Sequence, residues 1–267
     1  MSLLAGSVLF TLGPAALLKL LLISLAAGIG IAAVGPGGVL MTIGLFALTA
    51  MPPAAVAGTA IVTHIGTGIV GTAAYARSGE LRHRATRRLA LILAASAPPG
   101  VLAGMMINAY ISKQGFGILL GAFVAAIGIL VLHRQRSAGH AAAMPPPHAL
   151  PPALCALVGI AVATLASLFG LGGPMVCVPL LIALKVPVLS ALAAAQVQSV
   201  AGSALGTAGY ALGGAIDWPM AVFIAIPQMI GVVLGWKIAR CLPARTLAYA
   251  LAAVLIALAP YLALRGG

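Results

Sequence analysis

Charged side chains are scarce in this chain of 267 residues: only 6% are charged, and only two, Glu80 and Asp217, are acidic. A soluble domain needs roughly a quarter of its residues charged, so most of this surface must face lipid. Hydrophobic residues make up 63% of the chain and occur in continuous runs, which favours helices over the alternating strands of a membrane barrel. A spanning helix takes about 20 apolar residues. The sequence therefore predicts an all-α polytopic membrane protein with about eight to ten membrane segments.

Other absences limit the chemistry that this chain can perform. Neither acidic residue lies in a predicted segment, which excludes a carboxylate proton relay or a carboxylate-bound sodium ion. Cys155, Cys177 and Cys241 lack the spacing of metal ligands, and no Walker motif, HExxH motif or Ser/His/Asp cluster is present. We therefore expect no enzyme activity, no cofactor and no metal. The N-terminus lacks a basic region and an Ala-x-Ala site, so we expect no cleaved signal peptide.

The net charge of +12 comes from 14 Lys and Arg residues. These cations lie between the hydrophobic runs, where positive charge sets membrane orientation and contacts anionic lipid. No basic patch is interleaved with aromatic residues, so nucleic acid is not an expected partner.

Hydrophobic runs predict ten membrane segments separated by short loops. They lie at about 16–34, 38–51, 53–76, 86–108, 114–133, 152–169, 174–185, 187–212, 219–240 and 245–264. A polar, proline-rich stretch at 134–151 is typical of a linker. We therefore divide the chain into a first unit at 1–133, this linker, and a second unit at 152–267.

The two units repeat one another. When the first is shifted by 135 residues, Pro52 falls on Pro187 and Gly71-Thr72-Ala73 falls on Gly206-Thr207-Ala208. The glycine-rich break Gly35-Pro36-Gly37-Gly38 likewise falls on Gly170-Leu171-Gly172-Gly173. Matches of this kind in register indicate duplication of one helical unit.

Corresponding loops of the two units carry opposite charge bias. The loop at 77–88 holds five arginines, whereas its counterpart holds Asp217 and no cation. The next loop reverses the bias, with Lys113 alone in the first unit but three cations in the second. The positive-inside rule then predicts an inverted-topology repeat, with loops 77–88 and 134–151 cytoplasmic and both termini outside.

This inversion requires an odd number of crossings in each unit. All five segments could cross, or the first two could form a re-entrant hairpin followed by three spanning helices. The segments at 38–51 and 174–185 are too short to span comfortably, which favours the glycine-broken hairpin.

The paired glycine breaks are the first candidate for a substrate site. Interrupted helices of inverted repeats meet near the midplane of transporters, and each new helix there presents free N–H groups to an anion. The candidate glycines are Gly35, Gly37, Gly38, Gly170, Gly172 and Gly173. The alternative is that these glycines only allow helices to pack closely.

Polar side chains within the long segments that follow the breaks are the second candidate. They are Thr59, Thr63, His64 and Thr67 in the first unit and Gln196, Gln198, Ser199 and Ser203 in the second. Uncharged hydroxyl and amide donors suit an oxyanion that must also be released. His64 is the only ionisable side chain deep in a segment, which makes it a functional hypothesis, although a structural histidine is an equal alternative.

Three stretches resemble the TauE/SafE sulfite exporter family over nearly the whole chain. They are GPGGVLMTIGLFALTAMPPAAVAGTA at 35–60, SLFGLGGPMVCVPLLIALKVP at 167–187 and IPQMIGVVLGWKIA at 226–239. Gly58-Thr59-Ala60 stands where the family usually has Ala-Thr-Ser, and Ala194-Ala195-Gln196 replaces that motif in the second unit. The resemblance implies a bacterial inner-membrane permease for sulfite, organosulfonates such as sulfoacetate, or other small organic anions, usually acting in export.

Together these observations predict a secondary transporter of small anions that works by alternating access within the lipid bilayer. A passive anion channel and a structural subunit of a membrane complex remain alternatives. A homodimer is a possible assembly.

Overall fold

The computed structural model describes residues 7–33, 35–137, 150–241 and 244–265, and their regular elements are all helical. The first unit comprises η1 (Val8–Thr11), α2 (Pro14–Ala33), η2 (Pro36–Gly38), α3 (Val39–Leu48), α4 (Pro53–Arg77), η3 (Glu80–Arg82), α5 (Arg84–Ala95), α6 (Ala97–Tyr110) and α7 (Lys113–Ser137). The second comprises α8 (Pro152–Phe169), α9 (Pro174–Ala183), α10 (Val188–Leu212), α11 (Trp218–Cys241) and α12 (Ala244–Arg265). Most of the linker predicted at 134–151 lies outside the described residues.

Each predicted hydrophobic segment contains a helix, so the prediction of an all-α polytopic fold is confirmed. Within the described residues, seven spans are long and apolar enough to cross a membrane, with α5 and α6 counted together as one. The segment predicted at 86–108 is not one continuous helix, because it breaks at Ser96. Pro98 and Pro99 open α6 immediately afterwards, and neither can donate a backbone hydrogen bond to the preceding turn.

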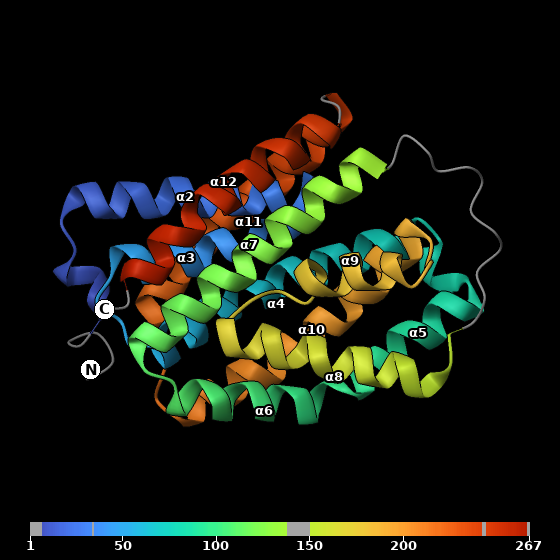
Figure 1. The fold of residues 1–267 in the computed structure, drawn as a ribbon, viewed down its shortest axis with the longest axis horizontal. Helices are drawn as coiled ribbons and strands as arrows, with labels where there is room; N and C mark the ends of the chain where they lie inside the picture. Colours follow the sequence, from blue (N-terminus) through green and yellow to red (C-terminus); the bar gives the residue numbers. More distant parts are fainter. Residues whose placement is uncertain (1–6, 34, 138–149, 242–243, 266–267) are drawn as a thin grey trace.

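The two halves of the chain are interleaved rather than placed side by side. Helix α2 packs mainly on α11, α6 on α8, α4 on α10, and α7 on α12. Figure 1 shows α2, α11, α12 and α7 together above α4 and α10, with α6 and α8 below them. In every one of these pairs, one helix comes from each predicted repeat.

Positions that correspond in the two repeats make similar close contacts at glycines. Gly231 of α11 lies against the carbonyl oxygen of Leu25, and Gly100 of α6 lies against that of Ile160. Leu25 and Ile160 differ by the same 135 residues that relate the two sequence repeats. The contact pattern therefore supports duplication of one unit.

Helices that correspond in the two units run antiparallel. On α4, Gly58 lies against Tyr210 of α10, and Gly71 lies against Gln196, so the two sequences run in opposite directions. The α7–α12 pair is antiparallel in the same way. This is the arrangement that an inverted repeat requires, although the sides of the membrane stay a prediction.

At each glycine-rich break, a long helix is followed by a short one. Helices α2 and α8 have 20 and 18 residues, whereas α3 and α9 have 10 residues each. Ten residues span only about 15 Å, half of the hydrocarbon core. The two arms of each glycine-broken hairpin are therefore unequal in length.

Adding one methyl group at Gly231 tests the close approach of α11 to α2. A Cβ there overlaps the carbonyl oxygen of Leu25, so Gly231→Ala should destabilise the protein by about 1–3 kcal/mol through overpacking. Gly202 is the control, because it is helical and nothing lies within 4 Å of an added Cβ. Gly202→Ala should be neutral or stabilising by up to about 1 kcal/mol. Thermal unfolding in detergent measures both, and a Gly231→Ala protein as stable as wild type would contradict the packing.

Candidate functional site

The two glycine breaks meet at the imidazole of His64. A Cβ added to Gly38 would lie 2.6 Å from Cε1 of His64, and one added to Gly172 would lie 2.8 Å from its Nδ1. His64 itself is 2% exposed, and its Nε2 has no hydrogen-bond partner among the described residues. A buried nitrogen without a partner costs free energy that a bound acceptor could recover. This histidine is therefore the point where both repeats contribute backbone to one site.

A small cavity adjoins this histidine. It is lined by seven of the predicted site residues, Gly35, Gly38, His64, Thr67, Gly172, Gln196 and Ser199, together with Ile31, Pro174 and Met175. Its volume is about 10 Å³, which is close to the space of one water molecule. The short helices α3 and α9 begin beside this cavity, and neither has a side-chain N-cap.

A second cavity of about 10 Å³ lies on the other side of Ser199, between α6, α8 and α10. Predicted residues Gly173, Gln198 and Ser203 line it along with Ser199. The Gln198 amide nitrogen donates to the carbonyl oxygen of Gly159 at 2.9 Å, which leaves its Oε1 without a partner. Ser199 therefore lines both small cavities, and its Oγ accepts a hydrogen bond from the Gly173 N–H at 3.3 Å.

Four predicted residues lie away from both cavities. Gly37 packs against the backbone of Gly30, and Gly170 packs against the backbone of Ala57 with a φ of 71°. These two contacts are what is expected if these glycines only allow helices to pack closely.

The other two are threonines of α4 whose hydroxyl groups bind backbone atoms. Thr63 donates to the carbonyl oxygen of Ala60 at 2.8 Å, within its own helix. Thr59 accepts from the N–H of Asp217 at 3.1 Å, next to the start of α11. Asp217 in turn accepts from the N–H of Met220, so this end of α4 serves to hold the start of α11.

Sequence reasoning missed three polar residues around the second break. Ser167 lines the second cavity, and its Oγ has no partner. Tyr210 donates to the carbonyl oxygen of Ser167 at 2.9 Å, and Asn108 donates to that of Leu168 at 2.6 Å. These carbonyls belong to the last turn of α8, where the regular helical hydrogen bonds end, and the Gly170 N–H also donates to the Ser167 carbonyl at 3.3 Å. A search for polar residues just before each break would have found Ser167 but not its donors, which come from other helices.

The arrangement offers only uncharged hydrogen-bond donors to a ligand. Imidazole, hydroxyl and amide groups meet where two helices begin, and no carboxylate lines either cavity in the described part of the chain. No group of three or more potential metal ligands occurs among the described residues. The donors that line the two cavities are of the kind that an acceptor-rich ligand would use.

Comparison with known proteins identifies a family for this chain. The family model described as "Sulfite exporter TauE/SafE" matches residues 20–262 of the chain. A curated relative from Xylella fastidiosa (strain 9a5c), named "Probable membrane transporter protein", is 27% identical over 183 residues, which are 66% of this chain and 69% of the relative. No solved structure matches the chain. With seven apolar helical spans in the part of the chain that the structure describes and a family match over residues 20–262, the chain is a multi-pass membrane transporter that belongs to the TauE/SafE sulfite exporter family.

Proposed function

We propose that this transporter moves small sulfur oxyanions or organosulfonates, such as sulfite or sulfoacetate, out of a bacterial cell across the inner membrane. The observation that carries the proposal is the position of His64 between the two glycine breaks, with an Nε2 that has no partner in the part of the chain that the structure describes. The description of the matching family supports a sulfur oxyanion as substrate.

The chemistry of the site supports an anion that binds and then leaves. An oxyanion accepts hydrogen bonds from hydroxyl and imidazole groups and is favoured at a helix N-terminus. A buried arginine would be costly in the membrane and would hold an anion tightly. Neutral donors at His64, Ser199 and Gln196 avoid the cost of burying a charge in the membrane and allow the anion to be released.

The size of the cavities supports alternating access. Each holds about one water molecule, whereas sulfite has four heavy atoms, so neither cavity can take it without movement. The walls of the cavity beside His64 come from both halves of the chain, α4 on one side and α9 and α10 on the other. Movement of one repeat against the other would open the site, as inverted-repeat transporters do. This closed state supports a transporter over a permanently open channel.

The proposed orientation places loops 77–88 and 134–151 in the cytoplasm and both termini outside. The arrangement of the helices supports a common side for the two loops. In Figure 1, the end of α7 and the starts of α5 and α8 lie at one end of the molecule, and the start of α2 and the end of α12 lie at the other.

Removal of the Ser199 hydroxyl tests the proposed substrate site. Anion binding should raise thermal stability with concentration, by about 2.7 kcal/mol at one hundred times Kd. We expect a shift with sulfite, thiosulfate or sulfoacetate but not with lactate or chloride. Ser199→Ala should weaken the affinity by about 5- to 150-fold, because one buried hydrogen bond is worth about 1–3 kcal/mol.

The control for this measurement is Thr164→Val, because the Thr164 hydroxyl donates to its own helix and lines neither cavity. It should bind like wild type. Equal affinity in Ser199→Ala would remove Ser199 from the site. No shift with any anion, sulfate and taurine included, would favour a structural subunit.

A methyl group at Gly172 tests the contact between the second break and His64. Gly172→Ala places a Cβ 2.8 Å from Nδ1, so the imidazole must move and sulfite efflux from proteoliposomes should fall at least tenfold. The double variant Gly172→Ala/His64→Ala removes this clash. It should regain thermal stability but not transport, because the donor is absent. Wild-type efflux in Gly172→Ala would show that this contact does not matter for transport.

Cysteine labelling tests the proposed orientation. In a background without the native cysteines, Ser78→Cys should react with a membrane-impermeant maleimide only after the membrane is opened. Leu12→Cys, next to the start of α2, should react in intact spheroplasts. The reverse pattern would place the termini inside and overturn the assignment from the positive-inside rule.

A further inference from the structure

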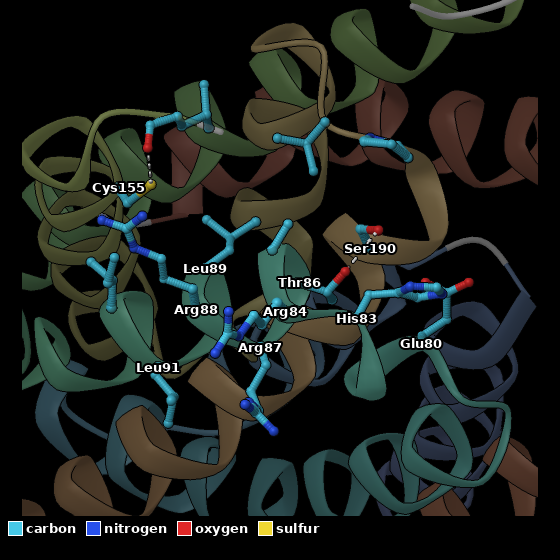
Figure 2. Close-up of a pocket in the computed structure, with 15 residues that line it drawn as sticks. Glu80, His83, Arg84, Thr86, Arg87, Arg88, Leu89, Leu91, Cys155 and Ser190 are labelled. Atoms are coloured by element: carbon cyan, nitrogen blue, oxygen red, sulfur yellow. Dashed lines mark hydrogen bonds between the residues drawn. The ribbon is translucent and has the colours of Figure 1, made fainter. Parts of the chain in front are cut away.

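A pocket of about 990 Å³ opens at the end of the molecule where α5, α8 and α10 begin. Its wall includes Arg84, Arg87 and Arg88 of α5, with Leu150 and Cys155 from the start of α8 and Ser190 from the start of α10. Figure 2 shows the three arginines between the Thr86–Ser190 contact and Cys155. We call it the arginine pocket.

The arginines of this pocket form no ion pair within the described residues. Positions 84, 87 and 88 are three and four residues apart, so their side chains share one face of α5. No ion pair joins any of them to a carboxylate among the described residues, and Glu80 is the single acidic residue in the pocket wall. Three unpaired guanidinium groups on one face create a concentrated positive field.

Helix ends add to this field. Helices α5, α8 and α10 all begin at the pocket, and none has an acidic residue in its first turn or a side-chain N-cap. Each helix start carries free N–H groups and about half a positive charge. Arginines in the first turns of α5 therefore repel the end of their own helix, and a bound anion would relieve that repulsion.

The lining of the pocket specifies an amphiphilic anion. Guanidinium groups bind tetrahedral oxyanions in bidentate geometry. Beside them lie apolar side chains, including Leu89, Ile92 and Val186. The volume is that of a pocket for an organic ligand rather than for a bare ion. A phosphate or sulfonate group would bind the guanidinium groups, and a carbon-rich body attached to it would contact the apolar side chains.

The arginine pocket is separate from the site at the glycine breaks. Ser190, in the pocket wall, precedes Ser199 by nine residues on α10, a rise of about 14 Å. Between them, Ala191, Ala193, Ala194 and Ala195 are fully buried. An anion in the pocket therefore cannot touch His64 or Ser199 in this conformation.

We propose that the arginine pocket is a second anion site, which binds the phosphate or sulfonate group of an amphiphilic anion. Two sources offer this chemistry: the headgroup of an anionic phospholipid, and a soluble organic anion. The proposal does not depend on the substrate assigned to the glycine breaks.

Native mass spectrometry of the detergent-purified protein tests the lipid source, with phosphatidylglycerol and phosphatidylcholine of identical acyl chains. Thermal shift with sulfoacetate and with glycerol phosphate tests the soluble source. The main variant is Arg84→Gln/Arg87→Gln/Arg88→Gln. The matched control is Arg77→Gln/Arg82→Gln, which removes exposed arginines of the same loop that do not line the pocket.

We expect the triple variant to lose at least tenfold in affinity for one class of anion, because it removes several charge-assisted hydrogen bonds. The control should stay within about twofold of wild type, as expected for exposed charges. Loss for phosphatidylglycerol but not for the soluble anions assigns a lipid, and the opposite pattern assigns a solute. Ser199→Ala should keep wild-type binding of phosphatidylglycerol and glycerol phosphate while losing sulfoacetate affinity at the glycine breaks, so the two sites are tested separately.

Arginines beside a span also set membrane orientation, so the triple glutamine variant could insert wrongly. Arg84→Lys/Arg87→Lys/Arg88→Lys keeps the charge and removes the bidentate geometry. It should express like wild type and bind the same anion several-fold more weakly. The proposal is overturned if this lysine variant binds every tested anion like wild type, or if the glutamine variant binds them like its control.

Discussion

The structure depends on satisfying backbone polar groups where two helices stop inside an apolar body. A free carbonyl or N–H group costs several kcal/mol in the absence of water, so irregular backbone at membrane depth must find partners within the protein. At the end of α8, Tyr210 and Asn108 supply those partners to the carbonyls of Ser167 and Leu168. Because these donors belong to α10 and α6, the second break also holds three helices together.

The duplication places two chemically different residues at one repeated position. Gly38 contacts His64, and the corresponding Gly173 contacts Ser199, which is the residue that corresponds to His64. His64 also reaches Gly172 of the other break, whereas Ser199 accepts a hydrogen bond from its own break. The pseudosymmetry therefore brings the breaks together, and the difference between imidazole and hydroxyl makes the result a single asymmetric site.

Positive charge and neutral donors are distributed according to the cost of desolvation. Arg84, Arg87 and Arg88 are exposed, and water offsets most of their solvation cost there. Deep in the bundle, where an unpaired guanidinium would be expensive, the polar groups around Ser199 are uncharged. An anion would thus meet a strong field at the surface and weaker, shorter-range donors inside, which is compatible with release.

The sequence alone determined the helical class, the positions of the membrane segments and both glycine breaks, because these follow from local composition and spacing. It also singled out His64 and Ser199, which lie buried in the structure, because polar residues are rare in such runs. Only the tertiary structure decided that the Thr59 hydroxyl binds the backbone of Asp217 and that Thr63 binds its own helix. It alone added Asn108 to the second break. The physical reason is that a polar side chain satisfies whichever backbone group packing brings within about 3 Å, and helix partners distant in sequence leave no local pattern.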